Sequence, residues 1–364
     1  MLIVLRHDDT AQVIIHTANM IPFDWGNMTQ GMWRSPLLPK LTDASKSQSG
    51  EIGSGGKLKT DLINYLKAYD TKRTICKPLV TELQKYDFSE IRAALVASVP
   101  VKQAIETDDE TSWGWLGLTN VLKSVPVSGI KSEIVVQISS IATLGANDKW
   151  LDKTLFKALE TSKLPTTSRP GVRIIFPTAD EVRRSLNGYQ SGSAIHTKIQ
   201  SAAQGKQLQY LKPLLCHWAG DGAQHSSSST DVSDAGRKRA APHIKTFVRF
   251  ANAEKTSIDW MLVTSANLSK QAWGERTNNT GDVRICSYEI GIMVWPELFG
   301  ESATMVPTFK SDTPAISDTS EGLVVGARMP YDLPLVPYAK DDIPWCASAS
   351  YTEPDWKGET WKVE

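Results

Sequence analysis

The sequence has few of the features that mark metal-binding, secreted or membrane-spanning proteins. Its four cysteines, Cys76, Cys216, Cys286 and Cys346, are widely scattered, and they form no CxxC pair or cluster with zinc spacing. No apolar run reaches the roughly 18 residues of a membrane-spanning helix, and the opening MLIVLRHDDT is too short for the core of a signal peptide. We therefore expect reduced thiols in an intracellular protein, no metal or cofactor, and no membrane partner.

An excess of charge of either sign is also missing. Lysine plus arginine number 40, as do aspartate plus glutamate, so the formal net charge is zero. This balance excludes a histone-like protein that binds nucleic acid through its overall charge, although a local basic groove stays open. With 364 residues, 41% of them hydrophobic and 22% charged, the chain is typical of globular proteins and long enough for two domains.

What the sequence does contain is one pattern used twice. Residues 13–26 read VIIHTANMIPFDWG and residues 261–274 read MLVTSANLSKQAWG, each with an apolar run, Ala-Asn and then Trp-Gly. Asn19 and Asn267 are 248 residues apart, too far for the period of a solenoid. The pattern predicts one supersecondary unit that occurs once in each of two similar domains. The matched tryptophans are expected to pack within the protein rather than to stack on bases.

Strands and helices alternate along the chain. Apolar and β-branched runs predict strands, the first two forming a hairpin, and helical patterns lie between them: strands at 2–5, 12–17, 91–100, 133–145 and 171–177, helices at 57–70 and 178–189. This alternation predicts an α/β fold with two sandwich domains. We assign residues 1–100 and 101–364 to them, with a polar junction at 101–112 and a disordered, Ser-rich loop at about 221–240.

His243, Lys245 and Asn267 form a group with coherent chemistry. His243 and Lys245 are separated by one residue, so on an extended segment both side chains point to the same side. A strand, a turn and a returning strand then bring Asn267 back beside them. Lysine and an amide suit the oxygens of a phosphate, while histidine serves as a nucleophile or as a general acid or base. His-x-Lys spacing alone also arises by chance, but the Asn and the repeated unit favour a catalytic site that needs no metal.

These residues resemble those of a known family. HIK followed by TSAN and LSKQAWG is similar to the C-terminal HxK(x)nN motif of fungal-like tyrosyl-DNA phosphodiesterases, a branch of the phospholipase D superfamily. The likeness covers nearly the whole chain, through HTANMIPFDW, TQGMWRSPL, SYEIGIMV, MPYDLP and the Trp-rich tail. It implies two phospholipase D-like α/β/α sandwich domains related by a pseudo-two-fold axis. Each domain of that family gives a His, a Lys and an Asn to one active site, and here the first domain would be incomplete.

The resemblance implies a DNA repair enzyme that removes topoisomerase I-derived tyrosyl groups and other adducts from DNA 3′ ends. In that family the N-terminal His attacks phosphorus to form a phosphohistidine. The C-terminal His protonates the departing tyrosine and then activates water. Matched residue by residue, His243 is the general acid and base, and Lys245, Asn267 and Asn19 hold phosphate oxygens. We expect a monomer that acts in the nucleus on DNA carrying a topoisomerase-derived peptide.

Four further positions match residues of that family: Gln30, Glu289, Ser139 and Ser140. Two serines of the second unit, Ser265 and Ser269, flank Asn267. The Gln and the Glu are expected to orient the two catalytic histidines across the pseudo-two-fold axis, the alternative for each being a polar residue that ends a strand. The two serines of the second unit are predicted to donate hydrogen bonds to phosphates. The Ser-Ser pair matches a segment that lines the DNA groove, or else it ends a strand.

The first unit departs from the family pattern, because no His-x-Lys precedes its first strand. By analogy with the second unit, the Lys would lie at or just before position 1 and the nucleophilic His two residues earlier. His7 lies in the hairpin turn at the far end of the strand and cannot substitute. We expect the chain to be a fragment or a gene model begun at an internal Met, inactive without the nucleophile and with an unpaired sheet edge.

Another His-x-Lys pair, His196 and Lys198 in IHTKIQ, has no Asn or Asp at the matching distance. We interpret it as structural or as a loop contact with substrate. Two functions other than a DNA phosphodiesterase stay open. A non-catalytic module that binds DNA 3′ ends would keep the same phosphate contacts. A lipid phosphodiesterase of the same superfamily is disfavoured, because Asn267 stands where ordinary phospholipases carry Asp.

Overall fold

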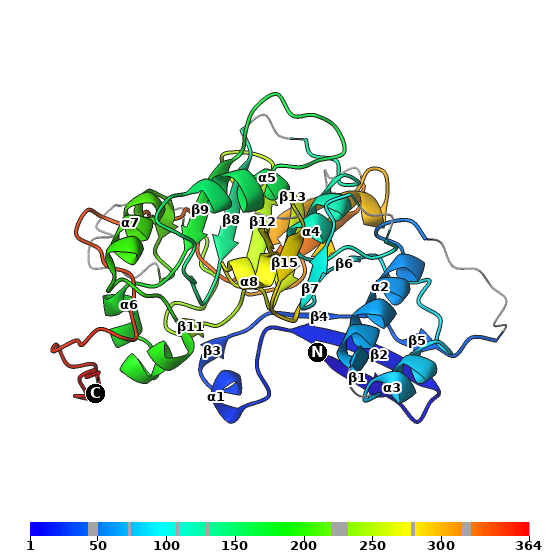
Figure 1. Ribbon diagram of the computed structural model, residues 1–364, viewed down its shortest axis with the longest axis horizontal. Coiled ribbons are helices and arrows are strands. Elements are labelled where there is room, and N and C mark those ends of the chain that lie inside the picture. The colour runs from blue at the N-terminus through cyan, green and yellow to red at the C-terminus, as the bar shows by residue number, and fades with distance from the viewer. Residues whose placement is uncertain are drawn as a thin grey trace.

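The largest sheet of the molecule has seven strands and occupies the centre of Figure 1. The computed structural model describes residues 1–42, 50–71, 74–106, 109–128, 131–219, 232–277, 281–314 and 322–363. In these residues the sheet has the order β10 (Leu215–Cys216), β9 (Gly171–Ile175), β8 (Glu133–Gln137), β12 (Thr246–Phe250), β13 (Ile258–Thr264), β16 (Glu289–Val294) and β6 (Ala94–Ser98). The first three strands are parallel, and every later neighbour is antiparallel. This mixed α/β architecture agrees with the class predicted from the sequence.

Helices cover this sheet because its strands are apolar. Ile134, Val135 and Val136 of β8 are at most 1% exposed. The predicted helix at 57–70 is α2 (Gly55–Ala68), which packs against β6. Its predicted apolar face is buried: Leu58, Leu62, Tyr65 and Leu66. No helix in the described part of the chain is long and apolar enough to cross a membrane.

The predicted helix at 178–189 is shorter than expected. It begins as predicted at Thr178, whose side chain forms a capping box with Glu181, but α6 (Ala179–Arg183) ends five residues before Gly188. Gly188 takes a φ of 59° and begins a 3₁₀ helix over Gly188–Ala194. Other described elements are α3 (Lys77–Leu83), α4 (Gly114–Leu122), a π-helix (Leu151–Phe156), α5 (Lys157–Leu159), α7 (Ala202–Leu211), β17 (Thr304–Thr308) and β18 (Val324–Arg328).

A smaller antiparallel sheet comes from the N-terminal part of the chain and lies below the large sheet in Figure 1. It contains β1 (Leu2–Leu5), β2 (Thr10–His16), β4 (Met32–Arg34) and β5 (Leu38–Pro39). β1 and β2 form the predicted hairpin, and β1 is an edge strand. Val13 and Ile15 of β2 are buried in one apolar cluster with Leu62 of α2 and Ile292 of β16. This cluster joins the small sheet to the large one.

Backbone hydrogen bonds cross the predicted domain boundary at residue 100. β6 precedes that boundary but pairs with β16 of the large sheet. β7 (Val101–Gln103) follows it and pairs with β15 (Val283–Ile285), which also pairs with β14 (Glu275–Arg276). The division into 1–100 and 101–364 therefore stays a prediction, and the β6–β16 pairing makes the two segments share one sheet.

The predicted disordered loop at about 221–240 lies partly outside the described residues, which resume at Val232. Ser233 and Leu333 exchange two backbone hydrogen bonds, at 2.9 and 3.1 Å. The backbone N–H of Ala235 donates to the Asp332 carboxylate at 2.8 Å. The part of the loop from Val232 onward is thus held in place, which departs from the prediction of disorder.

Candidate active site

The two Asn-bearing units end in the same hydrogen bonds. β2 and β13 each have seven residues and are followed by Thr17 and Ser265. The Thr17 hydroxyl donates to the Gln30 side chain at 2.7 Å and accepts the N–H of the residue after Gln30 at 2.8 Å. The Ser265 hydroxyl donates to Glu289 at 2.5 Å and accepts the N–H of the residue after Glu289 at 3.0 Å. Gln30 and Glu289 therefore occupy equivalent places in the two units.

The tryptophans of the two units also repeat one contact. The indole N–H of Trp25 donates to the Asn19 carbonyl at 2.9 Å, and that of Trp273 donates to the Asn267 carbonyl at 3.0 Å. Trp273 is 1% exposed, in agreement with the expected packing role, whereas Trp25 is 58% exposed. The two units thus form the same indole hydrogen bond, but the tryptophan is buried in the second unit and exposed in the first.

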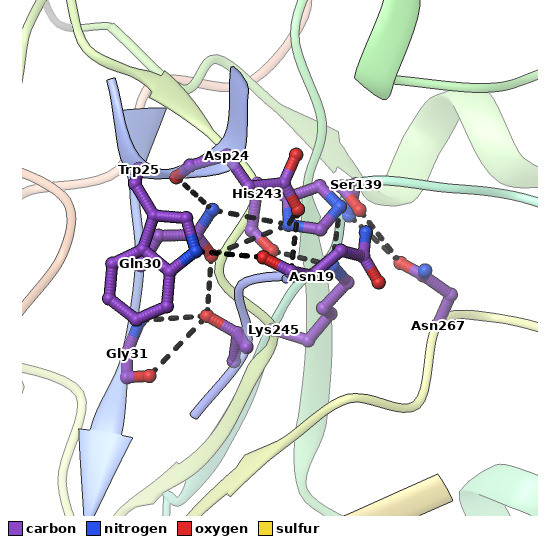
Figure 2. Close-up of polar contacts among 10 residues, drawn as sticks. Asn19, Asp24, Trp25, Gln30, Gly31, Ser139, His243, Lys245 and Asn267 are labelled. Atoms are coloured by element: carbon purple, nitrogen blue, oxygen red, sulfur yellow. Dashed lines mark hydrogen bonds and ion pairs between the residues drawn. The ribbon is translucent and has the colours of Figure 1, made fainter. Parts of the chain in front are cut away.

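His243 belongs to the second unit but is held by the first. β11 (Ala241–Pro242) pairs in parallel with β3 (Met28–Thr29), and the N–H of His243 donates to the Thr29 carbonyl at 3.0 Å. The ring Nδ1 lies 3.3 Å from the side-chain amide of Gln30 and 3.4 Å from Oδ2 of Asp24. Figure 2 shows Gln30 and Asp24 on one side of the imidazole.

The contacts of the two ring nitrogens indicate the tautomer of His243. Nδ1 lies 3.3 Å from the Gln30 side-chain oxygen and 3.4 Å from Oδ2 of Asp24, both of which can accept its proton, while the Gln30 amide nitrogen donates to the Asp24 carbonyl at 2.9 Å. On the other side of the ring, Nζ of Lys245 lies 3.2 Å from Nε2. An ammonium has donors and no acceptor, so Nε2 carries a lone pair. His243 therefore holds its proton on Nδ1 and presents Nε2 to the site.

Lys245 is a buried cation, and the structure describes no carboxylate within salt-bridge distance of it. The residue is 2% exposed, and the hydrogen bonds described for Nζ go to Nε2 of His243 and to the His243 carbonyl, at 3.2 and 2.5 Å. Burial lowers the pKa of Lys245 to about 7, while Glu289 and Asp24 act in the opposite direction. An incoming anion would favour the charged ammonium and form charge-assisted hydrogen bonds with it.

The surroundings of His243 favour its neutral form in the free site. Burial, followed by the charge of Lys245, lowers the pKa of His243 to about 4, and Asp24 acts in the opposite direction. An anion bound to Lys245 would offset the lysine charge and raise the pKa of His243. Substrate binding would therefore move the imidazole toward the range in which it both accepts and donates a proton near neutral pH.

Asn267 is held by the end of β8. Its side-chain oxygen accepts the backbone N–H groups of Ser139 and Ser140, at 3.0 and 2.9 Å, and lies 3.3 Å from the Ser139 hydroxyl. These contacts leave the amide N–H groups of Asn267 as its donors to a ligand. The predicted Ser-Ser pair thus positions the amide of Asn267.

Asn19 of the first unit reaches the same site. Its backbone N–H donates to Oδ2 of Asp24 at 2.7 Å, and its side chain is exposed. Figure 2 shows the Asn19 side chain beside His243 and Lys245. The predicted residues of both units are therefore gathered around one lysine and one histidine.

Asp24 is the site residue that sequence reasoning missed. It lies in α1 (Pro22–Trp25) and is 1% exposed, with its carboxylate between the Asn19 backbone and the His243 ring. The second unit has Ala272 at the matching place, so the repeat gave no signal for a carboxylate there. The aspartate reaches His243 because the chain after Asn19 turns back on itself, which spacing alone does not reveal.

The two serines of the second unit have different partners. The Ser265 hydroxyl is engaged by Glu289, a carboxylate whose pKa is raised by burial. Ser269 caps α8 (Lys270–Trp273) and accepts two backbone N–H groups, at 3.1 and 3.3 Å. The Ser269 hydroxyl thus keeps its own proton for another acceptor, whereas the proton of Ser265 is directed to Glu289.

The first unit brings no His-x-Lys pair to the site within the described residues. It supplies Asn19, Asp24 and Gln30, and the histidine of β2, His16, is 7% exposed with its ring 5.5 Å from that of Trp25. Among the same residues, no group of three or more His, Cys, Asp or Glu side chains is arranged to hold a metal. The described site therefore contains one His–Lys pair with amides from both units.

These features define an α/β protein in which two like units surround one buried Lys–His pair, and solved structures share its fold. A structure of a mutant of yeast tyrosyl-DNA phosphodiesterase matches with a TM-score of 0.69 at 21% sequence identity, over 94% of this chain and 75% of that chain. A second structure of the yeast protein gives a TM-score of 0.66 at 22% identity. At these identities the likeness shows the fold.

Sequence comparisons identify the family. The tyrosyl-DNA phosphodiesterase family model matches residues 1–339. A probable tyrosyl-DNA phosphodiesterase of Schizosaccharomyces pombe is 32% identical, over 97% of this chain and 75% of that protein. Tyrosyl-DNA phosphodiesterase 1 of Drosophila melanogaster is 33% identical over 93% of this chain, and that of Arabidopsis thaliana is 31% identical over 99%. The chain belongs to the tyrosyl-DNA phosphodiesterase family. It spans 54% and 60% of the length of the last two relatives.

Proposed function

We propose that this protein is a DNA repair phosphodiesterase that hydrolyses 3′-phosphotyrosyl and related adducts at DNA 3′ ends. The observation that carries the proposal is the buried Lys245, whose Nζ lies 3.2 Å from Nε2 of His243, with two Asn side chains from equivalent units around them. A desolvated ammonium with amide donors is suited to the non-bridging oxygens of a phosphodiester. The names of the relatives support the substrate, because each is a tyrosyl-DNA phosphodiesterase.

His243 is the general acid and base of this proposal. When a nucleophile forms a bond to phosphorus and displaces the tyrosyl group, the protonated Nε2 donates its proton to the tyrosyl oxygen as that P–O bond breaks. The neutral ring then accepts a proton from the water whose oxygen displaces this nucleophile from phosphorus. Gln30 keeps the other ring nitrogen protonated throughout. Lys245, Asn267 and Asn19 bind the phosphate oxygens, and Ser269 supplies a further donor.

A phosphohistidine intermediate requires a second imidazole to attack phosphorus opposite the tyrosyl oxygen. Glu289 is placed in the second unit as Gln30 is in the first, so it faces the position where such an imidazole would be oriented. The equal hydrogen bonds at Thr17 and Ser265 support two phospholipase D-like domains related by a pseudo-two-fold axis. Action on DNA with a topoisomerase I-derived peptide, as a monomer in the nucleus, belongs to the same proposal.

One observation favours a second function. The described site holds a single His–Lys pair, which suffices to bind a phosphate but supplies no separate nucleophile. A protein that binds DNA 3′ ends without cleaving them fits this feature. Cleavage and binding distinguish the two functions.

The test uses residues 1–364 and a 5′-labelled oligonucleotide ending in 3′-phosphotyrosine. Where a further group of the chain supplies the nucleophile, the enzyme proposal predicts a product with a 3′-phosphate end, and His243→Ala should lower its rate by about 10²–10⁴-fold. His7→Ala, in the exposed hairpin turn, is the control and should cleave at the parent rate. Binding of the oligonucleotide without cleavage would establish the binding module instead, and absence of both would overturn the proposal. Acid quenching and gel analysis would show whether a covalent protein–DNA adduct forms.

A further inference from the structure

His196 lies beside the segment that holds Asn267. The N–H of His196 donates to the Ser139 carbonyl at 2.9 Å, and its carbonyl accepts the N–H of Ile141 at 2.8 Å, as in a parallel strand pair. Asn267 and Leu268 contact the opposite edge of the same segment. The segment after β8 thus separates His196 from Asn267 by two strand spacings, roughly 10 Å between their backbones.

The backbone of His196 is fixed from a second direction. The indole N–H of Trp345 donates to the carbonyls of Gly192 and Ile195, at 3.0 and 3.1 Å, and the thiol of Cys346 lies 3.4 Å from the Thr197 carbonyl. Trp345 and Cys346 are both fully buried. The core therefore contacts the backbone on both sides of His196, which is the kind of support that a preorganised binding residue needs.

The side chain of His196 is nevertheless exposed. Burial alternates along this extended segment: Ile195 and Thr197 point inward, whereas His196 and Lys198 are exposed on the other side. Partial desolvation, followed by the charge of Lys245, lowers the pKa of His196, and a charge on His196 in turn lowers the pKa of His243. The imidazole therefore lies within the electrostatic reach of the catalytic pair and outside its hydrogen bonds.

We propose that His196 binds the DNA phosphate next to the scissile one. The scissile phosphate is taken by Lys245 and the two Asn side chains, and His196 lies across the Ser139–Ser140 segment from that position. A phosphate at His196 would extend the bound strand along the groove that this segment was predicted to line. His196 belongs to the His-x-Lys pair that does not fit the catalytic pattern. In this proposal it is a substrate-binding residue, whose ring N–H donates to a phosphate oxygen. This inference rests on the proposed function, since it takes DNA as the ligand.

Two product-like ligands isolate the contact. Thymidine 3′-phosphate carries one phosphate, and the dinucleotide dTpdTp carries the same terminal phosphate and a second one. Their dissociation constants are measured by calorimetry at one fixed salt concentration, because phosphate binding depends on salt. In the parent protein the second phosphate should tighten binding by about tenfold, the range of a hydrogen bond to a charged group. His196→Ala should lose this gain and bind the single-phosphate ligand as the parent does.

The matched variants make the outcome specific. His196→Gln keeps a side-chain donor and should retain part of the gain, while His7→Ala should retain all of it. An equal gain in the parent and in His196→Ala would overturn the inference, and so would equal weakening of both ligands, which would place His196 at the scissile phosphate. Absence of binding to the parent would overturn it as well. Failure of the proposed function shows separately, as absence of cleavage of the 3′-phosphotyrosyl oligonucleotide by the parent protein.

Discussion

The first unit, which contains β2, and the second unit, which contains β13, form the same hydrogen bonds but carry different functional side chains. Both place an Asn after a seven-residue strand, and in both a hydroxyl at the strand end holds a Gln or Glu. The second unit adds a buried Lys245 and His243, whereas the first adds Asp24, which together with Gln30 contacts the ring of His243. The difference teaches that the repeated backbone determines where a side chain lies, while the residue type determines whether it reacts with a substrate or orients a reacting residue. Changes at matched positions of the two units test this division.

The largest effect is expected from Lys245→Met. Loss of the ammonium should lower kcat/KM by about 10²–10³-fold, because a charge aimed at the transition state is removed. The same change should raise the free energy of unfolding at pH 7 by roughly 1–3 kcal/mol, because a poorly compensated buried charge disappears. Initial rates and thermal melts measure the two effects.

The pH dependence of stability sharpens this prediction. Burial lowers the pKa of Lys245 from its ordinary value of 10.5 to about 7 in the folded protein. Between these pH values Lys245 is protonated in the unfolded chain and largely unprotonated in the folded protein. The contribution of Lys245 therefore makes the free energy of unfolding rise with pH in that window. The rise should be weaker in Lys245→Met and unchanged in Lys206→Met, a control on the exposed side of α7. A melting temperature that falls in Lys245→Met would contradict the account.

Asn267→Ala and Asn19→Ala compare the two amides directly. Both should slow turnover, but only Asn267→Ala should also lower stability, by about 1–3 kcal/mol, because the buried N–H groups of Ser139 and Ser140 lose their acceptor. The Asn19 side chain is exposed, so its loss should leave stability within about 0.5 kcal/mol of the parent. Urea unfolding of both variants provides the measurement. Equal destabilisation of the two variants would contradict this prediction, because it would mean that both Asn side chains contribute equally to stability.

Trp273→Phe and Trp25→Phe should differ in the same sense. Trp273 is buried and donates to Asn267, so its replacement should cost about 1–2 kcal/mol from the lost hydrogen bond and the space left behind. Trp25 makes the matching contact at the surface, and its replacement should cost less than about 0.5 kcal/mol. Unfolding curves of both variants at one pH measure the two losses of stability. Equal losses would contradict the prediction.

The smallest effect concerns Asp24→Asn. The Asp24 carboxylate raises the pKa of His243, so its neutral replacement should lower that pKa further below about 4. Lys245→Met should move the pKa of His243 in the opposite direction. Titration of the His243 ring proton signals by NMR compares the three proteins. A rise in Asp24→Asn would show that the carboxylate does not act on this ring.

Local patterns predicted much of this molecule. The hairpin of β1 and β2, the buried face of α2 and the cap at Thr178 follow from periodicity and capping chemistry in short stretches. The grouping of His243, Lys245 and Asn267 also follows from spacing, because a hairpin returns the third residue to the first two.

Features set by distant contacts were not predictable in this way. β6 pairs with β16, almost 200 residues later, across a boundary that polarity alone suggested. Asp24 reaches His243 through a local turn and a parallel pairing of β3 with β11 that no single segment reveals. His196 lies beside the Ser139–Ser140 segment because it pairs with Ser140, far away in the sequence. Each of these placements depends on which segments meet in three dimensions.

The most direct test of the account is the protonation state of His243 at neutral pH. A long-range ¹H–¹⁵N NMR spectrum of the ligand-free protein separates protonated from unprotonated ring nitrogens. The account predicts a proton on Nδ1, held by Gln30, and a bare Nε2 facing Lys245. A proton on Nε2, or a fully charged imidazolium, would contradict it, because His243 would then be neither held by the first unit nor poised to exchange a proton with the substrate.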